Sequence, residues 1–236
     1  MNELHETKPA SRRERLRENA REEIKALARQ QMAASGTASI TLNVIARAMG
    51  VVPSALYRYY ADRDALITAL IVDAYASLAE TLLTATETIA DQQYGNRLQA
   101  AAEAYRIWAL AHPVDFQLIF GNPIPEYHAP IELTGPASMR VFGVFLQTLQ
   151  AAYLAGKLQP WVGYHPEALT AHKLNGSGQY APAAMYAGIM GWSKMHGMVT
   201  LELFGHLSHA IANPAIFFRS EMQSYLDTIG LPFETN

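Results

Sequence analysis

The chain has 236 residues, half of them hydrophobic and 17% charged, which is typical of a globular protein and excludes a disordered one. It has no cysteine, which excludes a disulfide framework, cysteine-ligated zinc and a thiol nucleophile. The formal net charge of −3 is uneven, because residues 1–63 hold eleven Lys/Arg against seven Asp/Glu and residues 64–236 hold seven against fourteen. A basic end on an acidic body is expected where only that end meets a polyanion, although chance patterning on a solvated helix would look the same.

The first twenty residues lack the apolar core of a secretory signal, and no run of about twenty apolar residues is present. We therefore expect a cytoplasmic protein without a membrane partner. Residues 1–11 are predicted to form a flexible arm ahead of the first helix.

The first helix is predicted from Ser11 to Ala34. "SRRE" reads as a capping box, with Ser11 as the cap and Glu14 reaching back, and Gly36 marks the stop. A second, short helix follows in "TLNVIARAMG", capped by Thr41 and ended by a glycine turn.

A third helix is predicted from Pro53 to Tyr60, with its proline at the first helical position, and a fourth begins near Asp62. Two short helices joined by a tight turn, behind a longer one, predict a helix-turn-helix. We place this domain at residues 12–62 and a larger helical domain at 63–236, so the predicted fold is all-α.

The larger domain is predicted to be helical over residues 96–111, 113–120, 135–156, 181–207 and 213–230, with Asn213 capping the last helix ahead of Pro214. Residues 157–180 read as a long loop that is either a lid or contains a short helix near residues 166–174.

The stretch "PSALYRYY" has the composition of a helix that enters the major groove. Its first residues, Pro53, Ser54 and Ala55, are slim enough to approach base edges. The hydroxyls of Tyr57 and Tyr59 can donate to phosphates on either side. The alternative is that the tyrosines pack the small domain's core, which we prefer for Tyr60.

Residues 41–70, "TLNVIARAMGVVPSALYRYYADRDALITAL", resemble the DNA-binding domain of the TetR family of bacterial transcriptional regulators. The resemblance implies a dimer that binds an operator in double-stranded DNA. One departure is Val52, where the family commonly has Ser or Thr. The implied DNA contacts, together with the flanking arginine of the third helix, are Thr41, Asn43, Pro53, Ser54, Ala55, Tyr57, Arg58, Tyr59 and Arg63.

"GWSKMHGMVTLELFGHL" is similar to the signature of a TetR-type C-terminal domain named for Trp192, His196 and Gly197. That similarity implies a homodimer whose last two helices form a four-helix bundle with their partners. Residues 182–207 carry only two charges, Lys194 and Glu202, so a partner subunit is the expected cover, with burial inside the monomer as the alternative. The expected interface residues are Gly188, Gly191, Met198 and Phe204.

A ligand site is expected among aromatic residues of the larger domain, because ligand cavities are mostly apolar with a few polar anchors. An ordinary aromatic core explains each residue equally well, and a histidine on a buried helix is more often a satisfied core residue. The candidate residues are Tyr105, Trp108, Phe116, Phe120, Phe142, Phe145 and His196.

Other chemistry has little support. His206 and His209 are spaced for one helix face, but no third metal ligand is evident, so we predict no metal and no cofactor. "NGSGQ" is neither a nucleophile elbow nor a phosphate loop, so no enzyme is predicted. The sequence predicts a DNA-binding repressor released from a palindromic operator by a small, largely apolar molecule. The alternative is an all-α ligand-binding or protein-interaction module without specific DNA binding.

Overall fold

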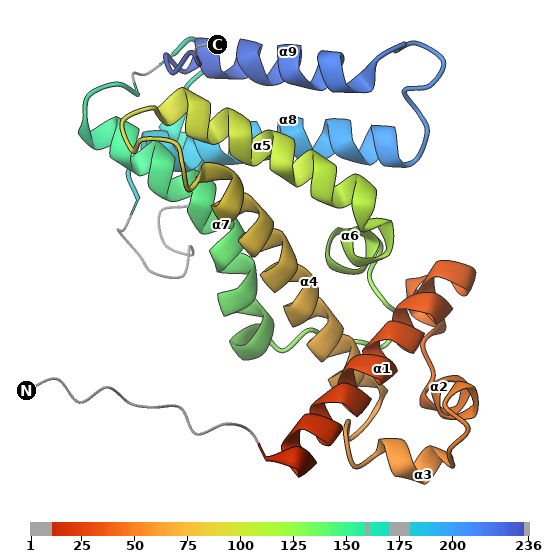
Figure 1. The fold of residues 1–236 in the computed structure, drawn as a ribbon. Helices are drawn as coiled ribbons and strands as arrows, with labels where there is room; N and C mark the ends of the chain where they lie inside the picture. The colour runs from red at the N-terminus through yellow and green to blue at the C-terminus, as the bar shows by residue number, and fades with distance from the viewer. Residues whose placement is uncertain (1–10, 159–160, 170–179, 234–236) are drawn as a thin grey trace, which may run out of the picture.

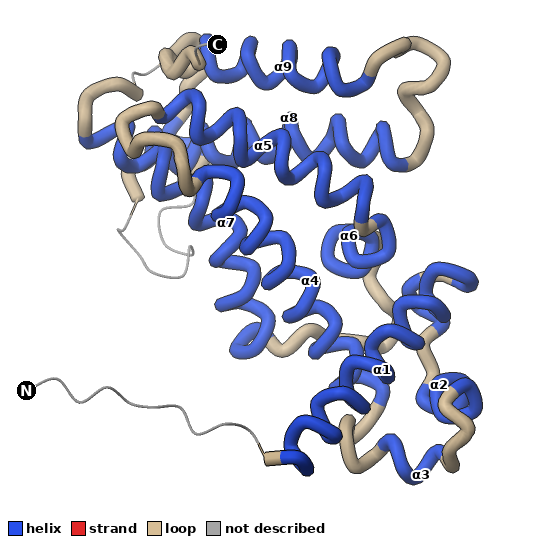
Figure 2. Tube along the Cα trace, viewed as in Figure 1, coloured by secondary structure: helices blue, strands red, loops and turns tan. Residues whose placement is uncertain are grey.

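The predicted all-α fold is confirmed. The computed structural model describes residues 11–158, 161–169 and 180–233, and within these ranges it contains helices and no strand (Figures 1 and 2). In chain order the elements are α1 (Arg12–Ser35), the 3₁₀ turn η1 (Thr37–Ser39), α2 (Leu42–Ala48), α3 (Pro53–Leu56), α4 (Arg63–Thr86), α5 (Tyr94–Ala111), α6 (Pro113–Phe120), α7 (Ile131–Leu154), the 3₁₀ turn η2 (Pro166–Ala168), α8 (Pro182–Leu203) and α9 (Pro214–Thr228).

Local capping signals correctly predict where several helices begin. The Ser11 side chain accepts from the backbone N–H of Glu14, whose carboxylate accepts in return from the Ser11 backbone N–H at 2.6 Å. Thr41 caps α2 and Asn213 caps α9, each by accepting a backbone N–H three residues on. Side-chain caps satisfy N–H groups that the first helical turn leaves unpaired.

Three helix boundaries differ from the prediction by more than two residues. The third helix was expected to reach Tyr60, but α3 ends at Leu56, because the backbone N–H groups of Tyr59 and Tyr60 both return to the Leu56 carbonyl. The seventh helix begins earlier than expected and has Pro136 inside it. The eighth ends at Leu203 instead of continuing to residue 207, and a turn with Gly205 at φ 76° follows.

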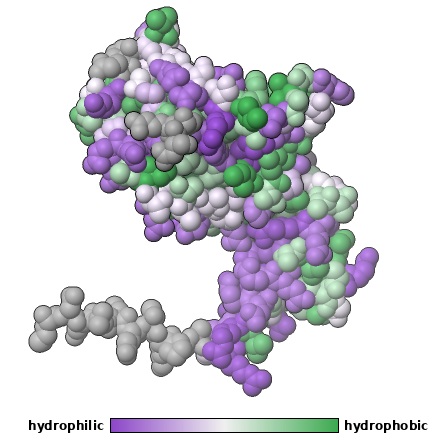
Figure 3. Space-filling model, turned by 45° about the horizontal axis from the view of Figure 1, so that its top comes forward, coloured by the Kyte–Doolittle hydropathy of each residue, from purple (hydrophilic) through white to green (hydrophobic). Residues whose placement is uncertain are grey.

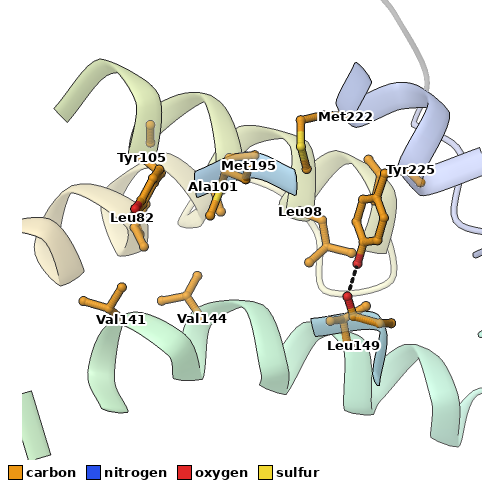
Figure 4. Close-up of a cluster of buried hydrophobic side chains, with 14 of the residues drawn as sticks. Leu82, Leu98, Ala101, Tyr105, Val141, Val144, Leu149, Met195, Met222 and Tyr225 are labelled. Atoms are coloured by element: carbon orange, nitrogen blue, oxygen red, sulfur yellow. Dashed lines mark hydrogen bonds between the residues drawn. The ribbon is translucent and has the colours of Figure 1, made fainter. Parts of the chain in front are cut away.

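The hydrophobic residues form two cores. The larger lies among α4, α5, α7, α8 and α9, where Leu82, Tyr105 and Met195 are almost completely buried (Figure 4). The smaller joins α1, α2 and α3 to the first half of α4, and it also includes Leu118 of α6 and Ile124 just beyond it. The small domain is therefore completed by residues from the body.

Helix α4 is the one helix in the described ranges that is long and apolar enough, by length and composition, to cross a membrane. Its apolar residues have a different explanation, because Leu66, Ile67 and Leu70 line the smaller core and Leu78 and Leu82 line the larger one. The composition of α4 is that of a helix buried on several sides.

Two sequence predictions fall at least half outside the described residues. The flexible arm was placed at residues 1–11, of which only Ser11 is described. The loop expected at 157–180 is described at 157–158, 161–169 and 180, where the short turn η2 occupies Pro166–Ala168.

Candidate functional site

The short helix α3 lies at the end of the molecule remote from α8 and α9 (Figure 1). Leu56 is 1% exposed and anchors this helix in the smaller core. Pro53 and Ser54 are exposed, Ala55 is half-buried, and Tyr57 is 54% exposed. The residues expected to meet base edges thus form a small, open surface with one tyrosine hydroxyl beside it.

The three tyrosines of this stretch have different environments. Tyr60 is 8% exposed in the smaller core, and burial raises the pKa of its phenol. Tyr59 is half-buried and packs against the same core, whereas Tyr57 points away from it into solvent. Of the three, Tyr57 has the most accessible surface for a phosphate.

Helix α2 contacts α3, and the N-terminal end of α2 is also open. Thr41 and Asn43 are both exposed, and the Thr41 hydroxyl accepts from the backbone N–H of Val44 at 3.4 Å. The side chain of Asn43 makes no hydrogen bond within the described part of the chain and is free for an outside partner.

Arg63 has a structural role that sequence reasoning missed. Its Nε donates to the carbonyl of Ile40 at 3.0 Å, and its Nη2 donates to the carbonyl of Ala38 at 3.2 Å. A weaker ion pair joins Nη1 to Asp64 at 3.6 Å. The guanidinium therefore ties the start of α4 to the segment that precedes α2, and two of its donor groups are already occupied.

In the body, a group of rings surrounds His196, which we call the His196 cluster. The His196 ring stacks on Phe116 at a centroid distance of 5.4 Å and on Trp192 at 5.0 Å, and Phe120 meets its edge at 5.1 Å. The Tyr105 hydroxyl lies 2.7 Å from Nδ1 of His196. Four residues expected at a ligand site, Tyr105, Phe116, Phe120 and His196, are thus brought together.

The polar groups of this cluster are uncharged near neutral pH. Burial lowers the pKa of the His196 imidazole and raises the pKa of the Tyr105 phenol. The indole Nε1 of Trp192 is buried and makes no hydrogen bond of normal geometry within the described residues, although its N–H acts on the Tyr105 phenol and lowers the pKa of that group against the larger effect of burial. The cluster therefore combines aromatic area with an N–H donor that lacks a well-aligned acceptor.

Other ligand candidates lie at its margin or elsewhere. Phe142 contacts the cluster through Trp192, at a centroid distance of 5.5 Å. Trp108 donates from Nε1 to Ser77 Oγ at 3.0 Å and has its ring against His112, so it packs α5 onto α4. Phe145 is half-buried against the larger core. Trp192, named above only for its motif, is the cluster residue that the aromatic pattern did not select.

Helix α6 contacts both the His196 cluster and the smaller core that supports the DNA-binding end. Phe116 and Phe120 belong to the His196 cluster, whereas Leu118 belongs to the smaller core. Asp115, also on α6, accepts from Arg29 of α1 at 2.9 and 3.2 Å. A shift of this eight-residue helix would consequently change both the ring contacts of the His196 cluster and the ion pair with α1.

Contacts within the chain explain why two of the expected interface residues are glycines. A Cβ at Gly191 would meet the Tyr225 ring of α9 at 2.6 Å, and one at Gly188 would meet Leu146 of α7 at 2.7 Å. Their lack of a side chain allows helix packing inside the protomer, so they give no support to a subunit contact. Met198 is half-buried and Phe204 is 49% exposed.

The two histidines considered as metal ligands do not share a helix face. His206 and His209 are exposed and lie in the turns that follow α8. No group of three His, Asp or Glu residues that could hold a metal ion occurs in the described part of the chain.

The chain matches two protein-family models. Residues 24–70 match that of the bacterial regulatory proteins of the tetR family, and residues 98–225 match that of the tetracyclin repressor-like C-terminal domain. The Trp-His-Gly subtype is not confirmed by this match. A curated relative, the HTH-type transcriptional regulator Rv1816 of Mycobacterium tuberculosis, is 31% identical over 221 residues, covering 87% of this chain and 92% of the relative.

Solved structures agree with these matches. The regulatory protein SCO4313 is 36% identical, with a TM-score of 0.78 over 92% of this chain and 100% of its own. A tetR-family regulatory protein from Rhodococcus RHA1 shares the fold, with 19% identity and a TM-score of 0.61 over 89% of this chain and 97% of its own. RolR, solved in complex with resorcinol, shares the fold at 14% identity and a TM-score of 0.52, over 94% of this chain and 98% of its own. The relatives are transcriptional regulators and not enzymes, and on these matches the chain belongs to the TetR family of DNA-binding bacterial transcriptional regulators.

Proposed function

We propose that this regulator is a cytoplasmic, homodimeric repressor that a small, flat, largely apolar molecule releases from a palindromic operator. The observation that carries the proposal is the position of α6. Phe116 and Phe120 of α6 belong to the His196 cluster, and Asp115 of the same helix pairs with Arg29 of α1. A ligand that changes the ring cluster would move α6 and, through it, the DNA-binding end.

The proposed DNA contacts divide by chemistry. Pro53, Ser54 and Ala55 are the small residues that approach base edges, and Asn43 extends that surface from α2. The hydroxyls and cations contact phosphates, which position the protein without reading sequence. This second group comprises Thr41, Tyr57, Arg58 and Tyr59, with Arg63 acting mainly through the segment it holds.

The ligand proposal follows from the surfaces of the His196 cluster. Its rings favour a planar apolar molecule that replaces ring–ring contacts by stacking. The buried Nε1 of Trp192 is a donor without a well-aligned acceptor, which favours a ligand bearing a carbonyl, hydroxyl or carboxylate oxygen. RolR, which shares this fold, binds resorcinol, a small aromatic molecule of that chemistry.

A dimer is proposed through α8 and α9. Ile189 and Leu201 of α8 and Phe204, directly after its end, are each more than 40% exposed, and Ile216 of α9 is 67% exposed. A Cβ at Gly197 would meet nothing within 4 Å, so the chain itself leaves this side of α8 open. Exposed apolar residues gathered on one face are typical of an interface between subunits.

Operator selection from random DNA, followed by ligand titration, tests the repressor model. The expected operator is palindromic, with half-site centres about one helical turn apart, or somewhat more for a wide dimer. A ligand that weakens operator binding must bind the free protein more tightly than the operator complex, by the same factor. Equal affinity for both states would refute ligand release, and absence of any selected sequence would favour the alternative of a protein-interaction module.

Sedimentation of interface variants tests the dimer separately. Leu201→Glu with Phe204→Glu would bury carboxylates in the proposed interface and should yield monomers, because an unpaired buried charge costs several kcal/mol. Leu154→Glu is the matched control, since Leu154 is 75% exposed at the end of α7. A dimer that survives the double substitution would remove this face of α8 from the interface.

A further inference from the structure

A series of basic residues on α1 points toward the DNA-binding end. Arg13, Arg17, Arg21 and Lys25 follow one another at intervals of four residues, so they lie on one face of the helix. Figure 1 shows that the N-terminal end of α1 and the helix α3 reach the same end of the molecule. The surface along α1 beside its N-terminal end is largely hydrophilic in Figure 3.

The carboxylate partners of this series are confined to its inner end. Lys25 is 8% exposed, and its Nζ lies 2.5 Å from Asp73 and 2.6 Å from Glu22. Arg21 has a buried Nε without a partner. In the described part of the chain, no ion pair joins Arg13, Arg17 or Arg21 to a carboxylate. Positive charge therefore accumulates uncompensated toward the start of α1.

The outer end of this series of basic residues lies beside α3. Nη2 of Arg17 lies 3.5 Å from the carbonyl oxygen of Arg58, which is two residues beyond the end of α3. That contact is long for a hydrogen bond and involves one of several guanidinium donors, so most of the cation stays available. Arg13, one turn further out, is exposed.

The acidic residues in the first two turns of α1 do not neutralise the face that carries Arg13 and Arg17. The Glu14 carboxylate is engaged in the capping box, where the hydrogen bonds to Ser11 lower its pKa and hold it as an acceptor. Glu18 is exposed and has no ion pair in the described residues. The two arginines are thus held beside a DNA-binding helix without a counter-charge of their own.

From this geometry we infer that Arg13 and Arg17 form a second DNA-contact element, which binds phosphates flanking those reached from α3. The inference rests on the proposed DNA contacts of α3 and extends them. Each phosphate neutralised by a cation releases condensed counterions, and this gives a salt dependence of about −0.9 in log–log slope per contact. The occupant is the same operator duplex, continued beyond the recognition helix.

The test measures operator affinity of the full chain at several salt concentrations. Arg13→Ala with Arg17→Ala removes four cations from a dimer on its operator. It should therefore lower the slope by about four and weaken operator and scrambled duplexes alike, with the selected sequence unchanged. Arg13→Lys with Arg17→Lys keeps the charges and should keep the slope. Arg140→Ala, an exposed arginine on α7, is the control for net charge and should also keep it.

A double alanine variant with the wild-type slope would overturn the inference, as would an equal loss in Arg140→Ala. A changed sequence preference would replace phosphate contacts by base contacts and would also overturn it. If the wild-type protein bound all duplexes alike, the proposed function itself would fail, which is a distinct result. Circular dichroism of each variant checks that α1 is intact. If the double alanine variant unfolds, the single variants Arg13→Ala and Arg17→Ala keep the test decisive, because each should lower the slope by about two.

Discussion

The hydroxyl of Tyr105 on α5 and Nδ1 of His196 on α8 lie 2.7 Å apart, at the centre of a cluster otherwise made of apolar rings. The two residues are 91 positions apart in the chain. Because burial keeps both side chains neutral, this is a hydrogen bond between uncharged groups and not an ion pair. It fixes the orientation of the imidazole that stacks between Phe116 and Trp192.

Tyr105→Phe removes that hydrogen bond and leaves a ring nitrogen of His196 unpaired. We expect the free energy of unfolding to fall by about 1–3 kcal/mol, the usual cost of a buried polar atom without a partner. Urea denaturation measures it. Tyr57→Phe removes an exposed hydroxyl and should change stability by no more than about 0.5 kcal/mol. Equal effects of the two substitutions would contradict the assigned bond.

Stability should also depend on pH through His196. Its pKa is lowered in the folded state, so the unfolded chain, with a pKa near 6.5, binds more protons just below that value. The contribution of His196 is therefore fully present above about pH 6.5 and is lost as the pH falls toward the folded pKa. Between about pH 7.5 and 5.5, the wild type should lose more unfolding free energy than His196→Gln. Parallel curves for the two proteins would argue against a buried neutral imidazole.

The Arg29–Asp115 pair links α1 to α6 and is partly buried, with the Asp115 side chain 11% exposed. Asp115→Asn should destabilise the protein by about 1–3 kcal/mol, because it leaves the Arg29 cation without its main partner. Asp91→Asn is the matched control, since Asp91 pairs with Arg97 but is 88% exposed, and exposed pairs contribute about 0–1 kcal/mol. Thermal unfolding of both variants measures the difference. Equal losses of stability would show that Arg29–Asp115 contributes no more than an exposed surface pair.

Alanine substitution at two glycines of α8 should change the free energy of unfolding in opposite directions. Gly191→Ala would put a Cβ 2.6 Å from the Tyr225 ring, and displacing that ring breaks its buried 2.8 Å hydrogen bond to the Ala187 carbonyl, the dashed line in Figure 4. We expect a loss of about 1–3 kcal/mol. A Cβ at Gly197 meets nothing within 4 Å in its own chain, so in the monomeric Leu201→Glu, Phe204→Glu background Gly197→Ala should stabilise the helix by about 0.5–1 kcal/mol. Chemical denaturation at one protein concentration gives both values.

Arg63→Ala should lower the stability of the protein and leave the salt dependence of operator binding nearly unchanged. The substitution frees the carbonyls of Ile40 and Ala38 and loosens the segment ahead of α2. We expect a lower melting temperature and faster hydrogen exchange in α2, with a change in the operator salt slope well below one unit. A slope change of about two units, one for each subunit of the dimer, with unaltered melting would instead make Arg63 a phosphate contact.

Features coded by neighbouring residues could be predicted from the sequence. The caps at Ser11, Thr41 and Asn213 depend on residues three positions apart, and the start of α3 on one proline. The length of α3 could not be predicted, because the turn after it depends on Tyr60 entering a core built from other helices. Likewise, the function of Gly191 follows from Tyr225 in α9, and that of Arg63 from carbonyls more than twenty residues away.

The smaller core has a consequence for how the chain unfolds. Leu66, Ile67 and Leu70 of α4 and Leu118 beyond it supply part of the interior around Ile24 and Leu56. A fragment ending at residue 62 would expose that interior to water and lack the apolar area needed to fold alone. The DNA-binding end and the body are therefore expected to melt in a single cooperative transition, and the regulator should lose both binding activities at the same temperature.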